Sequence, residues 1–120
     1  MNTALCSSCN SPMRVLTGAS LYLPAKLHKT KYLACVPCDM RVTLDITGNV
    51  MGTVAPANLR RSRQRVHRHM VRYIKESHRD KKSTYAWLGA KMRLPGGACH
   101  VALFDTAQCV KAMQILRGER

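Results

Sequence analysis

The hydrophobic positions follow two different periods along the chain. Residues 41–46 alternate strictly, which places Val42, Leu44 and Ile46 on one face and predicts a half-buried strand. From about residue 56 to residue 77 the apolar residues recur at three-, four- and seven-residue steps, which predicts an amphipathic helix. The apolar side of that helix consists of Leu59, Val66, Met70, Tyr73 and Ile74.

Shorter apolar runs complete the N-terminal pattern. Residues 13–16 and 21–23 flank a turn that contains Gly18, and we interpret them as a hairpin. Residues 32–34 form a further short apolar run that leads into a pair of cysteines. The first half of the chain is therefore expected to be built from short antiparallel strands.

The C-terminal third predicts two more helices. The first begins at Ser83 or Thr84 as its cap and stops at the run Leu94-Pro95-Gly96-Gly97. The second is preceded by Asp105 with Gln108 three residues later, which is the pattern of a capping box. It runs to about Leu116, and Gly118 follows its end. This helix is expected to bury Val110, Met113 and either Ile115 or Leu116.

Four cysteines give the strongest chemical signal. They form two Cys-x-x-Cys pairs, Cys6 with Cys9 and Cys35 with Cys38, separated by 25 residues, and this spacing is typical of one tetrahedral zinc site. Two disulfides would need an oxidising compartment. A redox motif would need only one pair in a βαβ setting. Zinc is the interpretation that fits both pairs.

Such a zinc ion would be structural, because four thiolates leave no open position for water or substrate. Asn10 and Asp39 follow the second cysteine of each pair, and these residue types tolerate the left-handed backbone that such turns require. His28 lies between the pairs, but a four-cysteine site is already complete without it, so we expect a surface histidine there.

These elements predict an α+β protein: a four-cysteine zinc ribbon of short antiparallel strands followed by a long basic helix and a small helical tail. We assign residues 1–47 to the ribbon, 48–56 to a connector, 57–82 to the basic amphipathic helix and 83–120 to the C-terminal helical unit. At 120 residues the chain has room for one compact domain or two small ones, and a metal often holds together a unit with a small core.

The charge distribution points to a polyanionic partner. The chain has 20 Lys and Arg against 6 Asp and Glu, a net charge of +14, and half of these basic residues lie between residues 57 and 82. An ordinary solvated helix face usually alternates its signs, whereas this one repeats like charges at helical spacing. The predicted phosphate contacts are Arg60, Arg61, Arg63, Arg65, Arg68, Arg72, Lys75, Lys81 and Lys82.

An enzymatic function is not expected. Cys99 next to His100 suggests a nucleophile and its base, but productive pairs are usually remote in sequence, so we interpret Cys99 and Cys109 as small buried hydrophobic residues. Six scattered acids do not form the cluster that a catalytic Mg²⁺ would need. We expect no small-molecule substrate.

The sequence also bears on location. The N-terminal residues lack the basic and then apolar pattern of a signal peptide, and no apolar stretch is long enough to span a bilayer. We therefore expect a cytosolic protein with no membrane partner.

Several segments follow one another in a characteristic order: the two cysteine pairs with Asp39, residues 57–63, residues 85–88, residues 99–105 and Cys109. This order resembles a zinc-finger-containing domain family of unknown function that is found in phages, prophages and other mobile elements. The resemblance extends over nearly the whole chain. It implies a metal-binding ribbon fused to a helical tail, in a bacterial or phage-infected cytoplasm, and it transfers only the four metal ligands.

Two functions remain open from the sequence. The first is a non-enzymatic nucleic-acid-binding protein, for DNA or RNA, whose basic helix contacts phosphates with little base readout. The second is a small phage adaptor or inhibitor that binds a host protein complex, for example in an anti-defence role, through the same basic face.

Overall fold

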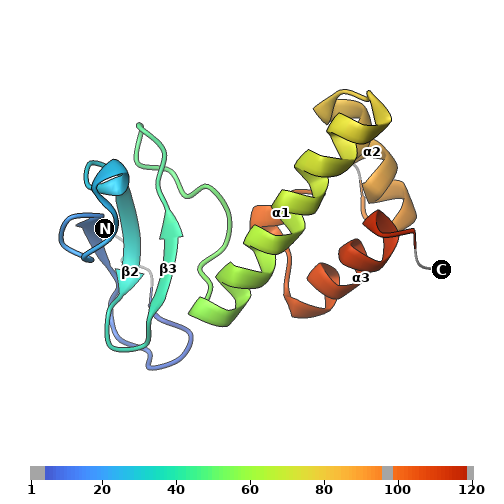
Figure 1. Cartoon of the computed structure of the whole chain (residues 1–120). Coiled ribbons are helices and arrows are strands. Elements are labelled where there is room, and N and C mark those ends of the chain that lie inside the picture. Colours follow the sequence, from blue (N-terminus) through green and yellow to red (C-terminus); the bar gives the residue numbers. More distant parts are fainter. Residues whose placement is uncertain (1–4, 96–98, 119–120) are drawn as a thin grey trace. The chain divides into compact units, whose positions relative to one another are not determined.

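The computed structural model describes residues 5–95 and 99–118. These form two compact units that divide between residues 57 and 58. The first unit contains strands and the second contains helices (Figure 1). The prediction of an α+β fold with a cysteine-bearing sheet followed by helices is therefore confirmed. The predicted stop at Gly96 and Gly97 lies outside the described residues.

A three-stranded antiparallel sheet in the order β1-β2-β3 forms the first unit. Its strands are β1 (Arg14–Thr17), β2 (Lys31–Cys35) and β3 (Met40–Thr43). Arg14 is paired with Ala34, and Cys35 is paired with Met40.

The strand predicted at residues 41–46 is present as β3 but ends at Thr43. Val42 and Leu44 are buried as expected, whereas Ile46 is fully exposed because the backbone turns at Asp45, whose carboxylate accepts hydrogen bonds from Thr47 and Asn49.

The predicted hairpin between residues 13–16 and 21–23 is wrong in its second strand. β1 pairs with β2 instead, and residues 18–23 fold into a compact turn in which the Leu23 N–H donates to the Gly18 carbonyl over 2.9 Å. A short 3₁₀ helix, Ala25–Leu27, follows. Gly18 permits this close packing, because a Cβ at this position would overlap the carbonyl oxygen of Leu27.

The segment predicted as a connector, residues 48–56, belongs to the first unit. Val50 forms an isolated bridge with Leu44, and Ala55 forms another with Arg41. Ala55 is completely buried. The segment thus adds hydrogen bonds to the edge of β3, because an uncovered edge strand would leave its backbone groups unpaired.

Three helices make up the second unit: α1 (Ala57–Ser77), α2 (Lys81–Lys91) and α3 (Thr106–Leu116), with a 3₁₀ turn at Val101–Leu103. α2 and α3 lie on the same side of α1 (Figure 1). Val66 and Met70 of α1 pack in one core with residues of α2, α3 and the segment between them. The buried members of that core are Val66, Met70, Leu88, Cys99, Val101, Phe104, Cys109 and Ala112.

The helix predicted for residues 57–82 is divided in two. α1 ends at Ser77, and His78 adopts a left-handed backbone with a φ of 58°. Asp80 then caps α2, because its carboxylate accepts a hydrogen bond from the Ser83 N–H over 2.6 Å. Asp80 is a strong N-cap residue, so α2 begins at Lys81 and not after the predicted caps Ser83 or Thr84.

The capping box predicted for α3 is confirmed. The Asp105 carboxylate accepts from the Gln108 N–H over 2.8 Å, and the Gln108 side chain accepts from the Asp105 N–H over 2.9 Å. Of the residues predicted to be buried on this helix, Met113, Ile115 and Leu116 are partly buried and pack against the core, whereas Val110 is exposed. The fully buried residues of α3 are Cys109 and Ala112.

A four-cysteine metal centre and a basic helix

The four predicted ligands converge in the first unit. The sulfur atoms of Cys6, Cys9, Cys35 and Cys38 all lie within 4.8 Å of one another. The Cys9 and Cys35 sulfurs are 3.6 Å apart, close to the separation of about 3.8 Å that two thiolates adopt on one tetrahedral zinc with Zn–S bonds of about 2.3 Å. They are much too far apart for a disulfide.

Local backbone geometry explains why each pair points inward. In the first turn the Asn10 N–H donates to the Cys6 carbonyl over 2.7 Å, and the Ser8 N–H points at the Cys6 sulfur at 3.4 Å. Asn10 and Asp39 have φ values of 62° and 52°. Both are in the left-handed conformation that the sequence predicted.

An apolar cluster packs around the metal-binding cysteines. Cys6 and Cys35 are buried together with Met13 and Met40, and Val54 packs against the same group. Such a shell restricts solvent access to a metal site. The four thiols therefore fit a closed, structural zinc site.

The thiols differ in how readily they ionise without metal. Hydrogen bonds from the side chain and backbone of Ser11 lower the pKa of Cys9 to about 6. The pKa of Cys35 is raised to about 12: a backbone hydrogen bond from Cys38 lowers it, but desolvation and proton sharing with the other thiols have the larger combined effect. Ser11 is not among the residues predicted for the site, although its position two residues after Cys9 is a signal for it.

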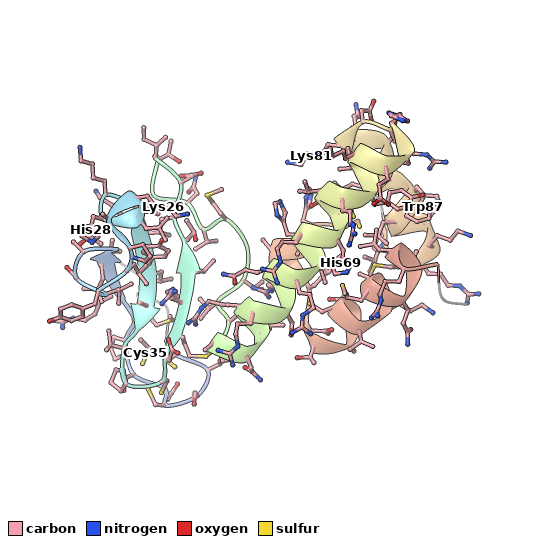
Figure 2. All side chains as sticks on the ribbon, viewed as in Figure 1. Lys26, His28, Cys35, His69, Lys81 and Trp87 are labelled. Carbon is pink, nitrogen blue, oxygen red and sulfur yellow. The ribbon has the colours of Figure 1, made fainter. Side chains whose placement is uncertain are left out.

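His28 takes no part in the metal centre. It is exposed, and its Nε2 makes a hydrogen bond of 2.8 Å with the Leu23 carbonyl. Figure 2 shows His28 away from the sulfur atoms around Cys35.

Cys99 and Cys109 lie in the core of the helical unit, as the sequence predicted. Burial raises the pKa of Cys99, and burial likewise raises that of Cys109 despite the nearby positive charge of Arg63. A raised pKa disfavours the nucleophilic thiolate. Both cysteines therefore act as core residues.

The basic residues of α1 lie in two environments. Five of them are exposed and recur at steps of four and three residues, so they form one line on the side of the helix opposite Val66 and Met70. We call this line the basic stripe. From residue 61 to residue 75 the stripe is about 21 Å long, because each step along the helix rises about 1.5 Å. Its members are Arg61, Arg65, Arg68, Arg72 and Lys75.

Two of the predicted phosphate contacts on α1 lie outside the stripe. Arg63 is only partly exposed, and its Nε–H donates to the Phe104 carbonyl over 2.8 Å. The sequence indicates that Arg63 lies on the apolar side of the helix, because it is four residues after Leu59 and three before Val66. Arg60 is also partly exposed. We assign Arg63 to the folding of the helical unit.

Lys81 and Lys82 are exposed but lie in the first turn of α2, so they do not continue the line of α1. Within the stripe, Arg72 forms an exposed ion pair with Glu76 at 3.2 Å. Exposed pairs of this kind contribute little to stability. The stripe therefore remains a strongly positive surface.

Comparison with known protein families matches residues 2–119 to a family described as a zinc-finger-containing domain. The chain belongs to this family. The resemblance noted from the motifs is confirmed, and the four-cysteine cluster supplies the metal centre that the family description implies. Searches of curated proteins and of solved structures found no match. Within the described part of this zinc-finger-containing chain, no helix combines the length and apolarity needed to cross a bilayer.

Proposed function

We propose that the protein is a non-enzymatic nucleic-acid-binding protein that contacts the phosphate backbone through the basic stripe of α1. The observation that carries this proposal is where the charges lie around the helix axis. Five exposed cations lie on the side opposite the buried residues of α1. Like charges at this spacing repel one another, and a line of phosphates relieves that repulsion. A phage or mobile-element origin, and action in the cytoplasm, belong to the same proposal.

The zinc unit has a structural role in this proposal. Four thiolates complete the coordination of the ion, so it would stabilise the fold and perform no chemistry. Contacts from the stripe to phosphates carry no sequence information by themselves. We therefore expect binding with weak sequence preference and strong dependence on salt.

The first test is a salt series with random-sequence duplex DNA and RNA. Five phosphate contacts predict a slope of about −4.5 in a plot of log K against log salt on duplex DNA. Replacing Arg61, Arg68, Arg72 and Lys75 by glutamine should reduce the steepness of that slope to near −1. A slope near zero for the unaltered protein would exclude the proposal.

A matched control distinguishes the contribution of the stripe to binding from that of the net charge of the protein. Arg14, Lys26, Lys29 and Lys31 are four exposed basic residues of the first unit, and replacing them by glutamine removes the same charge. The control should retain most of the affinity. Equal losses in the two variants would mean that total charge, and not the stripe, attracts the nucleic acid.

A second candidate function, an adaptor that binds a host protein, is favoured by exposed apolar side chains on the zinc unit. Tyr22 is 96% exposed and has a φ of 57°, and Val36 between the second pair of cysteines is also exposed. Exposed apolar groups that are rimmed by polar ones often mark protein contacts. A host protein retained from nuclease-treated lysate, and lost with Tyr22→Ser, would favour the adaptor.

A further inference from the structure

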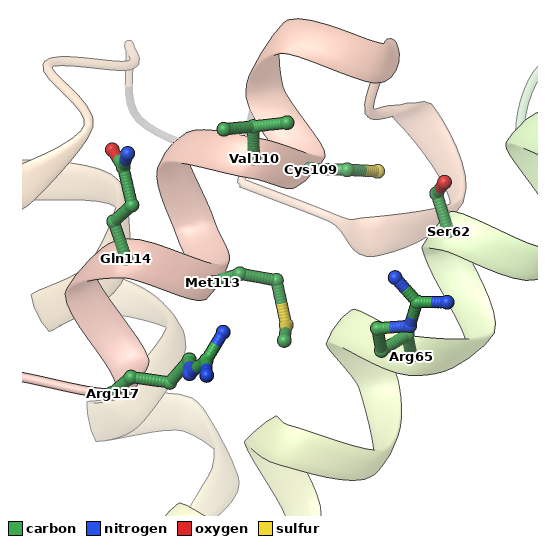
Figure 3. A pocket seen from close by; sticks show the side chains of 7 residues that line it. All are labelled: Ser62, Arg65, Cys109, Val110, Met113, Gln114 and Arg117. Carbon is green, nitrogen blue, oxygen red and sulfur yellow. The ribbon is translucent and has the colours of Figure 1, made fainter.

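A groove between α1 and α3 continues from the basic stripe. It encloses about 310 Å³. Figure 3 shows Arg65 on α1 and Arg117 at the end of α3, with the end of the Met113 side chain between them. Arg65 belongs to both the groove and the stripe. A chain of phosphates that follows the stripe would therefore pass the mouth of the groove.

We propose that this groove binds a single unpaired nucleotide, with its base against Met113 and Val110 and its phosphate near Arg65 and Arg117. The inference rests on the proposed function and goes beyond it, since it predicts a preference for single-stranded over duplex nucleic acid. The volume is at the lower end for small-molecule sites. It suits one base and little more.

The groove is lined by the apolar and hydrogen-bonding groups that binding of a nucleotide requires. The Met113 thioether is polarisable and packs well against aromatic rings. The Ser62 hydroxyl donates to the Asn58 carbonyl over 3.2 Å, which leaves its oxygen to accept, and the exposed Gln114 amide offers both a donor and an acceptor.

An acidic peptide is the competing ligand, and the chemistry of the groove favours the nucleotide. A carboxylate side chain would use the two arginines but would leave the apolar surface of Val110 and Met113 uncovered. A nucleotide carries its anion and its aromatic ring on one scaffold. The arginines of the lining match the phosphate, the apolar groups match the face of the base, and the amide matches the polar edge of the base.

The test compares two labelled single strands of about 12 nucleotides, within the usual site sizes for single-strand binders. One is oligothymidylate, and the other has the same phosphates but no bases. The intact protein should bind the thymidylate strand about three- to tenfold more tightly, the range expected for thioether contact with a ring. The abasic strand should still bind through the stripe.

Two valine variants locate the base. Val110→Glu places a carboxylate in the groove, whereas Val71→Glu places one on α1 outside it; the two valines are 54% and 53% exposed. Val110→Glu should abolish the preference for thymidylate over the abasic strand, whereas Val71→Glu should keep it. The preference is a ratio of two affinities of the same variant, so ion pairs of a carboxylate at position 71 with Arg68 and Lys75 do not change it. Circular dichroism verifies that both variants fold.

The outcomes are distinguishable. Equal binding of the two strands by the intact protein would overturn the groove inference and leave the proposed function standing, whereas no binding of either strand would remove both. A preference that survives Val110→Glu would place the base elsewhere and overturn the inference. A glutamate-rich peptide could also displace the thymidylate strand. If it does so from Val71→Glu but not from Val110→Glu, the groove is a protein-binding site and the inference is overturned.

Discussion

At the scale of single residues, the six cysteines differ in what surrounds their sulfur atoms. Four share a cluster within 4.8 Å, whereas Cys99 and Cys109 are buried among apolar side chains of the helical unit. All six are free thiols. The chemical environment, and not the residue type, decides which of them bind metal.

Replacing one ligand should therefore have a different effect from replacing a core cysteine. Cys35→Ser removes a buried ligand, and we expect the purified protein to lose its zinc, because the hydroxyl does not replace a thiolate in this site. Cys109→Ala should retain one zinc per chain. Metal analysis of the two purified variants measures this, and zinc lost equally from both would contradict the assignment of ligands.

Two neighbouring arginines provide a second test at this scale. Arg63 donates to the Phe104 carbonyl, whereas Arg61 is exposed. Arg63→Ala should lower the free energy of unfolding of the helical unit by about 1–2 kcal/mol, since it removes the partner of that carbonyl. Arg61→Ala should change that free energy by less than about 0.5 kcal/mol. Chemical denaturation followed by helical circular dichroism compares them, and similar values would mean that Arg63 has no structural role.

At the scale of elements, the junction between α1 and α2 depends on Asp80. Its carboxylate accepts from the Ser83 N–H, and hydrogen bonds from Ser83 hold the pKa of Asp80 below its ordinary value. A pKa that is lower in the folded state means that the ionised form favours folding. This contribution is complete above the unfolded value of about 3.9, and it is lost as the pH falls through the folded value.

The expected consequence is a steeper loss of thermal stability in acid for the unaltered protein than for Asp80→Asn. Asparagine is also a good N-cap residue, so the variant should keep the helix start but lose this titration. The measurement is the midpoint of helical unfolding at pH 5 and at about pH 3. Because the other carboxylates titrate in both proteins, parallel decreases would show that Asp80 contributes no pH dependence.

The elements also show what the sequence could and could not predict. The cysteine turns were predictable because their geometry is local, and the left-handed Asn10 and Asp39 follow from it. The strand expected at residues 21–23 is absent because the N–H groups of Leu21 and Tyr22 donate within the turn, to Thr17 and Ala19. A short apolar run fits a strand or a packed turn equally well, and only the pairing of β1 with β2 decides between them.

The sequence predicted that this surface is basic, but it did not predict correctly which residues form it. The helical phase determines which arginines are exposed, and Arg63 could have been assigned to the apolar side from its spacing to Leu59 and Val66. The break at His78, by contrast, depends on competition between the cap of Asp80 and continuation of the helix. The groove depends on where α3 packs on α1, which no local pattern reveals.

At the scale of the whole molecule, the two units have separate sources of stability. The first has a small apolar cluster around Cys6, Met13, Cys35 and Met40, and we expect its fold to depend on the metal. The second has its own core around Phe104, Leu88 and Met70. No metal-ligating cluster was found among the described residues of the helical unit.

Removing zinc from the intact chain should therefore unfold one unit and spare the other. On addition of a strong chelator we expect the amide protons of β2 and β3 to lose their protection from exchange, while those of α1 and α3 keep theirs. Hydrogen exchange with mass spectrometry reads both units in a single sample, and returning zinc should restore protection in the strands. If the helices lose protection together with the strands, the two units fold as one, and the zinc would then also determine whether the basic stripe exists.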